Sequence, residues 1–180
     1  MKFILIRHTV TDYNIAKRIQ GRTDTELTEQ GCIDAEELSN KLQGLGISKI
    51  ITSNLKRCSK TAEIINSKLK VPITSDKRLR ECSFGLVEGM TREEAIAKHG
   101  QSITKNWDDQ YKEYDFRKFG GENQKSVLMR HLDLLKDCSK SNSEETVILL
   151  VGHGRGMATL LATLGYEPLL KKGEYCIIEY

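Results

Sequence analysis

The first residues that could do chemistry are a guanidinium and an imidazole placed side by side. Arg7 and His8 directly follow the apolar run Phe3–Ile6, where neither side chain helps to pack a core. A neighbouring cation keeps an imidazole neutral near pH 7, because it lowers a pKa that ordinarily lies near ~6.5. We therefore interpret His8 as a candidate nucleophile. For a lone histidine, capping of a strand at the surface is the ordinary alternative.

Two further segments place anion-binding groups directly after predicted strands. Ser53 and Arg57 open a helix after the run Lys49–Thr52, and the exposed amides of a helix start attract anions. His153 is the centre of Gly152–Gly154, where the missing side chains let a ligand approach the backbone closely. An arginine near a helix start is usually solvated. The segment 53–57 therefore indicates an anion site only in combination with residues 7–8 and 152–154.

A glycine-punctuated loop supplies carboxylates. In the segment Leu79–Gly89, Glu81 is suited to act as a general acid that protonates a leaving oxygen, whereas Glu88 is at least as well explained as a solvated surface residue. Two arginines, two histidines and one carboxyl together predict a pocket for a phosphoryl group. Transfer of that group needs positioning and neutralisation of charge, and the pattern requires no metal.

Alternating strands and helices must position these groups. Strands are predicted at 3–6, 49–52, 71–74, 146–151 and 176–179, and helices at 28–42, 53–69, 91–98, 107–114, 125–138 and 155–164. This order predicts an α/β fold, a three-layer α/β/α sandwich with a mostly parallel central sheet. Ligands of such sheets bind beyond the carboxyl ends of the strands, so residues 7–8, 53–57 and 153–154 should meet.

Composition narrows the class of protein. With 180 residues and 38% hydrophobic content, the chain fits one domain over 1–180, and a net charge of +3 is too mild for a dedicated nucleic-acid binder. The five cysteines are scattered without a C-x-x-C pair, which indicates reduced thiols inside a cell. We find neither a signal-peptide core nor a run of ~18 apolar residues, so we expect a cytoplasmic protein without membrane or nucleic-acid partners.

The motifs resemble the histidine phosphatase (phosphoglycerate mutase-like) superfamily in order and spacing over nearly the whole chain. The residues that carry the resemblance are Arg7-His8, Asn14, Gln20-Gly21, Leu27-Thr28-x-x-Gly31, Ser53-x-Leu55-x-Arg57-x-x-x-Thr61-Ala62, Leu79-Arg80-Glu81 and Gly152-His153-Gly154.

This resemblance implies a role for each position. His8 would accept the phosphoryl group, Glu81 would donate the proton, and three residues would hold the phosphoryl oxygens: Arg7, Arg57 and His153. The phosphate and substrate pocket would be lined by Asn14, Gln20, Gly21 and the amide of Gly154. The segment Gly120–Glu122 resembles a family loop near the substrate entrance. The implied partner is a small phosphomonoester, without cofactor or metal; a homodimer stays open.

Two residues depart from the family pattern. Thr9 stands where a glycine follows the nucleophilic histidine, which would add a Cβ and a hydroxyl beside the pocket, and Arg155 stands where a smaller residue is common. Both could reshape specificity without removing the chemistry. Cys58 and Cys82 are interpreted as buried and inert, and His99 and His131 as structural.

Other phosphate-handling classes fit less well. A cysteine-nucleophile phosphatase needs C-x-x-x-x-x-R and an aspartate-nucleophile phosphatase needs D-x-D after a strand, and the sequence has neither. A dinucleotide site at Gly152-x-Gly154-x-Gly156 would meet Lys171-Lys172 where a ribose-binding acid is expected. A phosphoglycerate mutase and a non-catalytic phosphate-binding domain remain alternatives. The short segment 81–121 favours hydrolysis, with α-ribazole phosphate and broad-specificity substrates both open.

Overall fold

The central element of the fold is a mixed sheet. The structure, a computed structural model, describes residues 1–108, 111, 113–168 and 171–180. Within them the strands are β1 (Lys2–Arg7), β2 (Ile47–Thr52), β3 (Ile73–Ser75), β4 (Val147–Gly152) and β5 (Tyr175–Glu179). Their order is β3-β2-β4-β1-β5, and only β5 runs antiparallel to its neighbour. The predicted mostly parallel sheet is confirmed.

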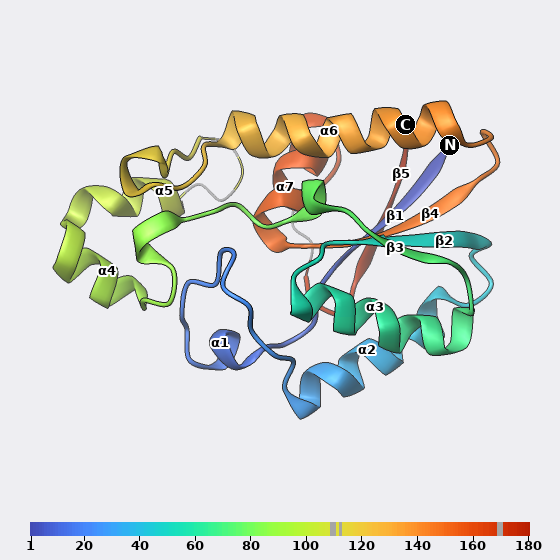
Figure 1. Cartoon of the computed structure of the whole chain (residues 1–180), viewed down its shortest axis with the longest axis horizontal. Coiled ribbons are helices and arrows are strands. Elements are labelled where there is room, and N and C mark those ends of the chain that lie inside the picture. Colours follow the sequence, from blue (N-terminus) through green and yellow to red (C-terminus); the bar gives the residue numbers. More distant parts are fainter. Residues whose placement is uncertain (109–110, 112, 169–170) are drawn as a thin grey trace.

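Helices cover both faces of the sheet (Figure 1). The α-helices are α1 (Asp12–Ile15), α2 (Glu29–Leu42), α3 (Lys56–Leu69), α4 (Arg92–His99), α5 (Lys105–Asp108), α6 (Gln124–Ser141) and α7 (Gly154–Thr163). Short 3₁₀ turns are η1 (Lys77–Leu79), η2 (Gly85–Val87), η3 (Gln101–Thr104) and η4 (Arg117–Phe119). In Figure 1, α6 and α7 lie on one side of the sheet and α2 and α3 on the other, which confirms the three-layer α/β/α sandwich.

The apolar run of β1 serves both faces because side chains alternate along a strand. Phe3 and Leu5 pack with residues of α6 and α7, whereas Ile4 and Ile6 pack with residues of α2 and α3. All four side chains are almost fully buried. A strand covered on both faces therefore has a continuous apolar sequence instead of an alternating one.

A smaller apolar cluster lies beyond the sheet, in the segment between η1 and α6. Its buried residues are Cys82, Phe84, Val87, Ala95, Ile103, Trp107, Tyr114, Phe116, Phe119 and Val127. Figure 1 shows α4 and α5 at the end of the molecule opposite the N-terminus, on the same side as α1. Helices α1, α4 and α5 therefore lie near the carboxyl ends of the parallel strands, where the ligand site is predicted.

Several predicted boundaries need correction. The strand expected at 71–74 is Ile73–Ser75, since Pro72 has no N–H and only Ile73 to Ser75 pair with β2. The helix expected at 107–114 ends at Asp108, and Tyr114 instead turns its buried hydroxyl toward Thr159 at 3.2 Å. Residues 109, 110 and 112 of that prediction lie outside the described residues.

Two features near the site differ from the expected pattern. The loop after β1 contains the unpredicted helix α1, which Thr11 and Asn14 close with a reciprocal capping box. Helix α3 begins at Lys56 rather than near Ser53. Helix α2 does begin after Thr28, whose hydroxyl accepts from the amide of Gly31 at 3.0 Å as an N-cap should. Among the described residues, no helix combines the length and the apolar character needed to cross a bilayer.

Candidate active site

Strand pairing brings the two predicted histidines together. Arg7 is opposite Gly152 in the β1–β4 ladder, and the amide of His8 donates to the carbonyl of Gly152 at 3.0 Å. On the other side of β4, the amide of Ser53 donates to the carbonyl of Val151 at 2.9 Å. The chain ends of β1, β2 and β4 are thus adjacent, as predicted. The rings of His8 and His153 lie with their centroids 5.3 Å apart.

His8 is held as a neutral imidazole with one nitrogen open. Its Nδ1 lies 2.8 Å from the carbonyl of Thr9, and a carbonyl only accepts, so Nδ1 carries the proton. Nε2 forms no hydrogen bond with any described residue, and His8 lines a cleft. Burial, followed by the charges of Arg57 and Arg7, holds the pKa of His8 well below its ordinary value. The predicted neutral state is found, although burial contributes more than the cations do.

Arg7 and Arg57 bring buried donors to the cleft. Nη1 and Nη2 of Arg57 donate to the carbonyls of Thr23 and Gly21 at 2.8 and 2.7 Å. The Nε atoms of both arginines are buried and have no partner among the described residues. Unpaired buried donors are costly, so two of them beside His8 are placed to bind a phosphoryl oxygen.

His153 is fixed by its neighbours in the complementary tautomer. Nη2 of Arg57 lies 3.1 Å from Nδ1 of His153, which must accept, so Nε2 donates to the hydroxyl of Ser53 at 2.9 Å. Burial, followed by the charge of Arg57, holds the pKa of His153 well below its ordinary value. Ser53 therefore orients the second histidine, a role that the sequence motif did not reveal.

Glu81 lies against the start of α7. Its carboxyl oxygens accept from the backbone amides of Cys82, Gly156 and Arg155 at 2.9, 3.2 and 3.3 Å. The first turn of a helix has no internal partners for its amides, and here two of them bind Glu81. The side chain is 8% exposed and lines the cleft beside His8. The three amides thus hold the carboxyl group of Glu81 at the wall of the cleft that His8 also lines.

The predicted pocket residues Asn14, Gln20, Gly21 and Gly154 all line the same cleft. The carbonyl oxygen of Gln20 accepts from the hydroxyls of Thr11 and Thr25 at 3.0 and 2.8 Å, which leaves its amide nitrogen for a ligand. Gly154 is the first residue of α7, so its amide has no partner inside the helix. A Cβ on Gly154 would come 3.0 Å from Cζ of Arg7.

The rest of the cleft wall is cationic and aromatic. The lining residues not discussed so far are Arg18, Ile19, Phe84, Arg92, Trp107 and Arg155. Arg155 packs its guanidinium over Tyr114 at 4.5 Å from the ring centroid and donates to the carbonyl of Asn106 at 3.0 Å. The departure from the family pattern at Arg155 thus lies in the cleft. The aromatic residues of the wall, Phe84 and Trp107, come from the 81–121 segment, in which the helix predicted at 107–114 is corrected by the structure.

The expectations for Thr9 and for the start of α3 need correction. The hydroxyl of Thr9 lies 3.4 Å from that of Thr61 on α3, and Thr9 does not line the cleft. The amide at the start of α3 binds Asp24 at 3.0 Å, so this helix end is already occupied. The resemblance of Gly120–Glu122 to a loop near the substrate entrance stays a prediction. None of the three residues lines the cleft, but Gly121 packs against the backbone of Ser83 and of Phe84, which does line it.

The cysteines and remaining histidines lie where the sequence suggested. Cys58 is buried, and burial raises its pKa to about 12, while burial also raises the pKa of Cys82. His131 is buried on α6 and its Nδ1 donates to the carbonyl of Val127 at 2.8 Å. His99 packs edge-on against the ring of Phe119. Within the described part of the chain, no three His, Cys, Asp or Glu side chains gather as metal ligands would.

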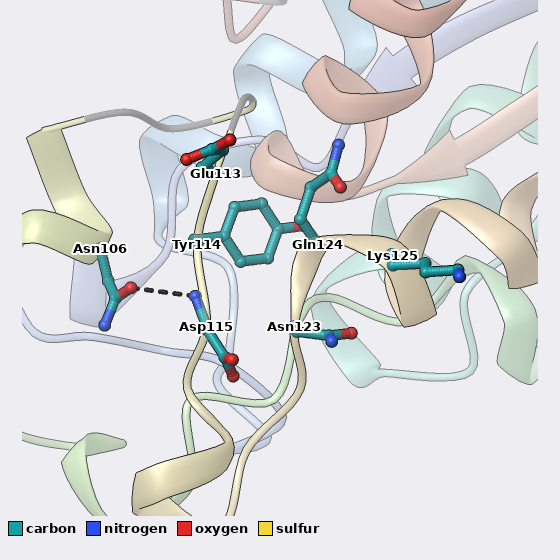
Figure 2. Close-up of a pocket in the computed structure, with 7 residues that line it drawn as sticks. All are labelled: Asn106, Glu113, Tyr114, Asp115, Asn123, Gln124 and Lys125. Atoms are coloured by element: carbon teal, nitrogen blue, oxygen red, sulfur yellow. Dashed lines mark hydrogen bonds between the residues drawn. The ribbon is translucent and has the colours of Figure 1, made fainter.

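A second hollow shares no lining residue with this cleft. Figure 2 shows its wall, formed by residues near α5 and the start of α6, with the backbone amide of Asp115 donating to Asn106 at 2.9 Å. None of the residues predicted for catalysis lies there. Of the residues predicted for catalysis, Arg7, His8, Arg57 and Glu81 line the first cleft, whereas His153 is fully buried behind Arg57 and does not line it.

Comparisons with known proteins agree with this geometry. The family described as "Histidine phosphatase superfamily (branch 1)" matches residues 3–174. Among curated proteins, the "Probable phosphoglycerate mutase GpmB" of Proteus mirabilis is 33% identical over 170 residues, covering 91% of this chain and 74% of that protein.

Solved structures show the same fold. YhfR of Bacillus stearothermophilus superposes with a TM-score of 0.87 at 30% identity, covering 99% of this chain and 90% of that one. Mycobacterial glucosyl-3-phosphoglycerate phosphatase, solved with VO3, gives 0.81 at 30% identity, covering 91% and 81%. A putative alpha-ribazole-5'-P phosphatase from Escherichia coli gives 0.82 at 23% identity, covering 99% and 89%, and shows likeness of fold. With the family match over residues 3–174, the chain belongs to the histidine phosphatase superfamily.

Proposed function

We propose that the protein hydrolyses small phosphomonoesters in the cytoplasm through a phosphohistidine on His8, without a metal ion. One observation carries the proposal: Nδ1 of His8 is committed to the carbonyl of Thr9 and Nε2 has no partner among the described residues, while His8 lines a cleft together with Arg7 and Arg57, whose Nε atoms are buried and unpartnered. A neutral nucleophile next to fixed positive charge matches what phosphoryl transfer requires. Five free cysteines support an intracellular location.

In the first step, the lone pair of His8 Nε2 forms a bond to phosphorus and the bond to the leaving oxygen breaks. The oxygen takes a proton from Glu81, and Arg7 and Arg57 hold the phosphoryl oxygens. His153, whose two ring nitrogens are bound to Arg57 and Ser53, orients the guanidinium of Arg57 from behind. The proton stays on Nδ1, which donates to the Thr9 carbonyl, and this hydrogen bond stabilises the cationic phosphohistidine.

In the second step, Glu81 takes a proton from water as the water oxygen attacks phosphorus. The P–N bond breaks, its electron pair returns to Nε2, and inorganic phosphate leaves. The enzyme is restored with Glu81 protonated, so atoms and charges balance over the cycle.

A phosphoglycerate mutase is the second candidate, because the curated relatives carry that name. The two activities share the phosphohistidine and differ in its fate. A mutase returns the phosphoryl group to a second hydroxyl, whereas a phosphatase gives it to water. The short 81–121 segment favours the phosphatase.

The test is a panel of phosphomonoesters, including α-ribazole phosphate and 3-phosphoglycerate, assayed with excess chelator and with a parallel assay for phosphoglycerate interconversion. We expect chelator-resistant phosphate release that His8→Ala abolishes, with a labelled phosphohistidine in acid-labile form. Interconversion faster than release would establish the mutase instead. Activity that appears only with added metal, or none at all, would contradict the proposal.

A further inference from the structure

A half-buried ion-pair network lies behind Glu81, in the segment that the family resemblance placed near the substrate entrance. Glu122 joins two arginines, with Oε1 at 2.9 Å from Nη2 of Arg22 and Oε2 at 3.2 Å from Nη2 of Arg130. The side chains of Glu122 and Arg130 are only 19% and 15% exposed. Neither residue lines the cleft, so the network does not touch a substrate there.

Arg130 binds the backbone that leads to Glu81. Its Nη1 donates to the carbonyls of Arg78 and Arg80 at 2.5 and 2.6 Å, and its Nη2 donates to the carbonyl of Glu81 at 3.1 Å. Three carbonyls within four residues thus converge on one guanidinium. Because the fork of an arginine is rigid and planar, it fixes the path of the chain at that point.

Glu122 holds the chain on the other side of Glu81. Its Oε2 accepts from the amide of Ser83 at 3.0 Å, and its own amide donates to the carbonyl of Ser83 at 2.8 Å. The residues before and after Glu81 are therefore held by two oppositely charged side chains that also bind each other. Through Arg22, the residue after Gly21, the same network reaches the loop that binds Arg57.

Stability alone does not account for such a network. Burying charges costs several kcal/mol per ion, and apolar residues of similar volume often give equal or greater stability. Burial would raise the pKa of Glu122, but Arg130, the Ser83 amide and Arg22 hold it below its ordinary value, so the carboxylate stays charged. What the network provides is a fixed geometry, which catalytic groups need to within about 0.5 Å.

We propose that Arg130 and Glu122 are positioning residues that hold the Glu81 carboxyl where it can protonate the leaving oxygen. This inference rests on the proposed function. It assigns to the Gly120–Glu122 segment a role behind the general acid in place of contact with the substrate. The two residues act through the backbone of 78–83 and take no part in proton transfer themselves.

The experiment compares esters that differ in their need for an acid. Glycerol 3-phosphate has an alkoxide leaving group, whereas p-nitrophenyl phosphate leaves without much help from a proton. For Glu122→Gln and Arg130→Lys we expect the first step, measured as leaving-group release in a single turnover, to slow about tenfold or more with glycerol 3-phosphate and less than about threefold with p-nitrophenyl phosphate. Asp115→Asn, which breaks the exposed ion pair with Arg117, is the matched control and should change neither.

A double-variant cycle separates positioning from a general loss of structure. In a Glu81→Gln background, Glu122→Gln should cause no further loss with glycerol 3-phosphate, because the group that it positions is already disabled. Equal losses on both esters, or additive losses in the Glu81→Gln background, would overturn the inference while leaving the proposed function intact. A wild-type enzyme that releases phosphate from neither ester would instead overturn the proposed function.

Discussion

Arg57 and His153 are in direct contact, with Nη2 of Arg57 3.1 Å from Nδ1 of His153. The contact decides the tautomer of the imidazole, so the remaining N–H, on Nε2, donates to the hydroxyl of Ser53. Ser53→Ala removes that acceptor, and we expect kcat to fall about tenfold with little change in melting temperature. Ser67→Ala, on the exposed side of α3, is the control. A kcat equal to that of the wild type would show that Ser53 does not orient His153.

Arg57→Lys should keep the positive charge but lose the hydrogen-bond geometry of the guanidinium group. Arg57 reaches two carbonyls and His153 at once and still presents Nε, which an ammonium group cannot reproduce. We expect kcat/KM to drop by about a hundredfold or more, as is common when a transition-state donor is lost. Lys60→Arg on the same helix is the control. Steady-state kinetics with p-nitrophenyl phosphate decide the outcome, and a loss below tenfold would speak against the assigned role.

Glu81→Gln should separate substrates by their leaving groups. The amide has a similar shape but cannot donate an acid proton, so alkyl phosphates should lose about a hundredfold or more in turnover, within the range usual for general acid catalysis. p-Nitrophenyl phosphate should lose much less in the first step. Rates measured over a series of leaving groups would show a steeper dependence in the variant. Equal losses across the series would contradict the role of Glu81 as the proton donor.

Gly21→Ala should impair activity more than the same substitution at Gly44, another glycine with positive φ. Gly21 has φ +52°, and a Cβ there would come 2.3 Å from Oε1 of Glu88. Gly44 has φ +80° but faces open space. Both changes should destabilise the fold by about 1–2 kcal/mol through the left-handed backbone. We expect only Gly21→Ala to raise KM and lower kcat, since its carbonyl holds Arg57; similar activity in both variants would refute this.

Stability should fall steeply on the acid side. His8, His131 and His153 are buried with lowered pKa values, that of His131 at about 3, and burial is the first cause in each. The unfolded chain binds their protons below about pH 6.5, so stability is complete above that pH and is lost below it, by about 1.4 kcal/mol per pH unit for each histidine.

Urea unfolding between pH 8 and 5 tests this slope. His8→Asn removes one of the three titrating groups and should reduce the slope by about a third. An unfolding free energy that stays constant between pH 6.5 and 5 would mean that the histidines are protonated in the folded protein as well.

The apolar runs, the glycines and the order of motifs in the sequence were enough to predict the sandwich, the mostly parallel sheet and a core of the cleft-lining residues, among them Arg7, His8, Arg57 and Glu81. Strand runs such as Phe3–Ile6 need only local chemistry to be recognised, because burial on both faces demands continuous apolar character. Since parallel strands end at one edge, the meeting of His8, Arg57 and His153 also followed.

Tertiary structure alone decided the tautomers, the place of Glu122 and the wall built from the 81–121 segment. That segment folds around aromatic contacts such as Tyr114 with Arg155, which connect residues distant in sequence and leave no periodic pattern. The direction of Thr9 toward Thr61, away from the cleft, depended on the packing of α3 against β1. A motif specifies which residues are present, but the hydrogen bond that orients each one comes from a neighbour that only the folded chain supplies.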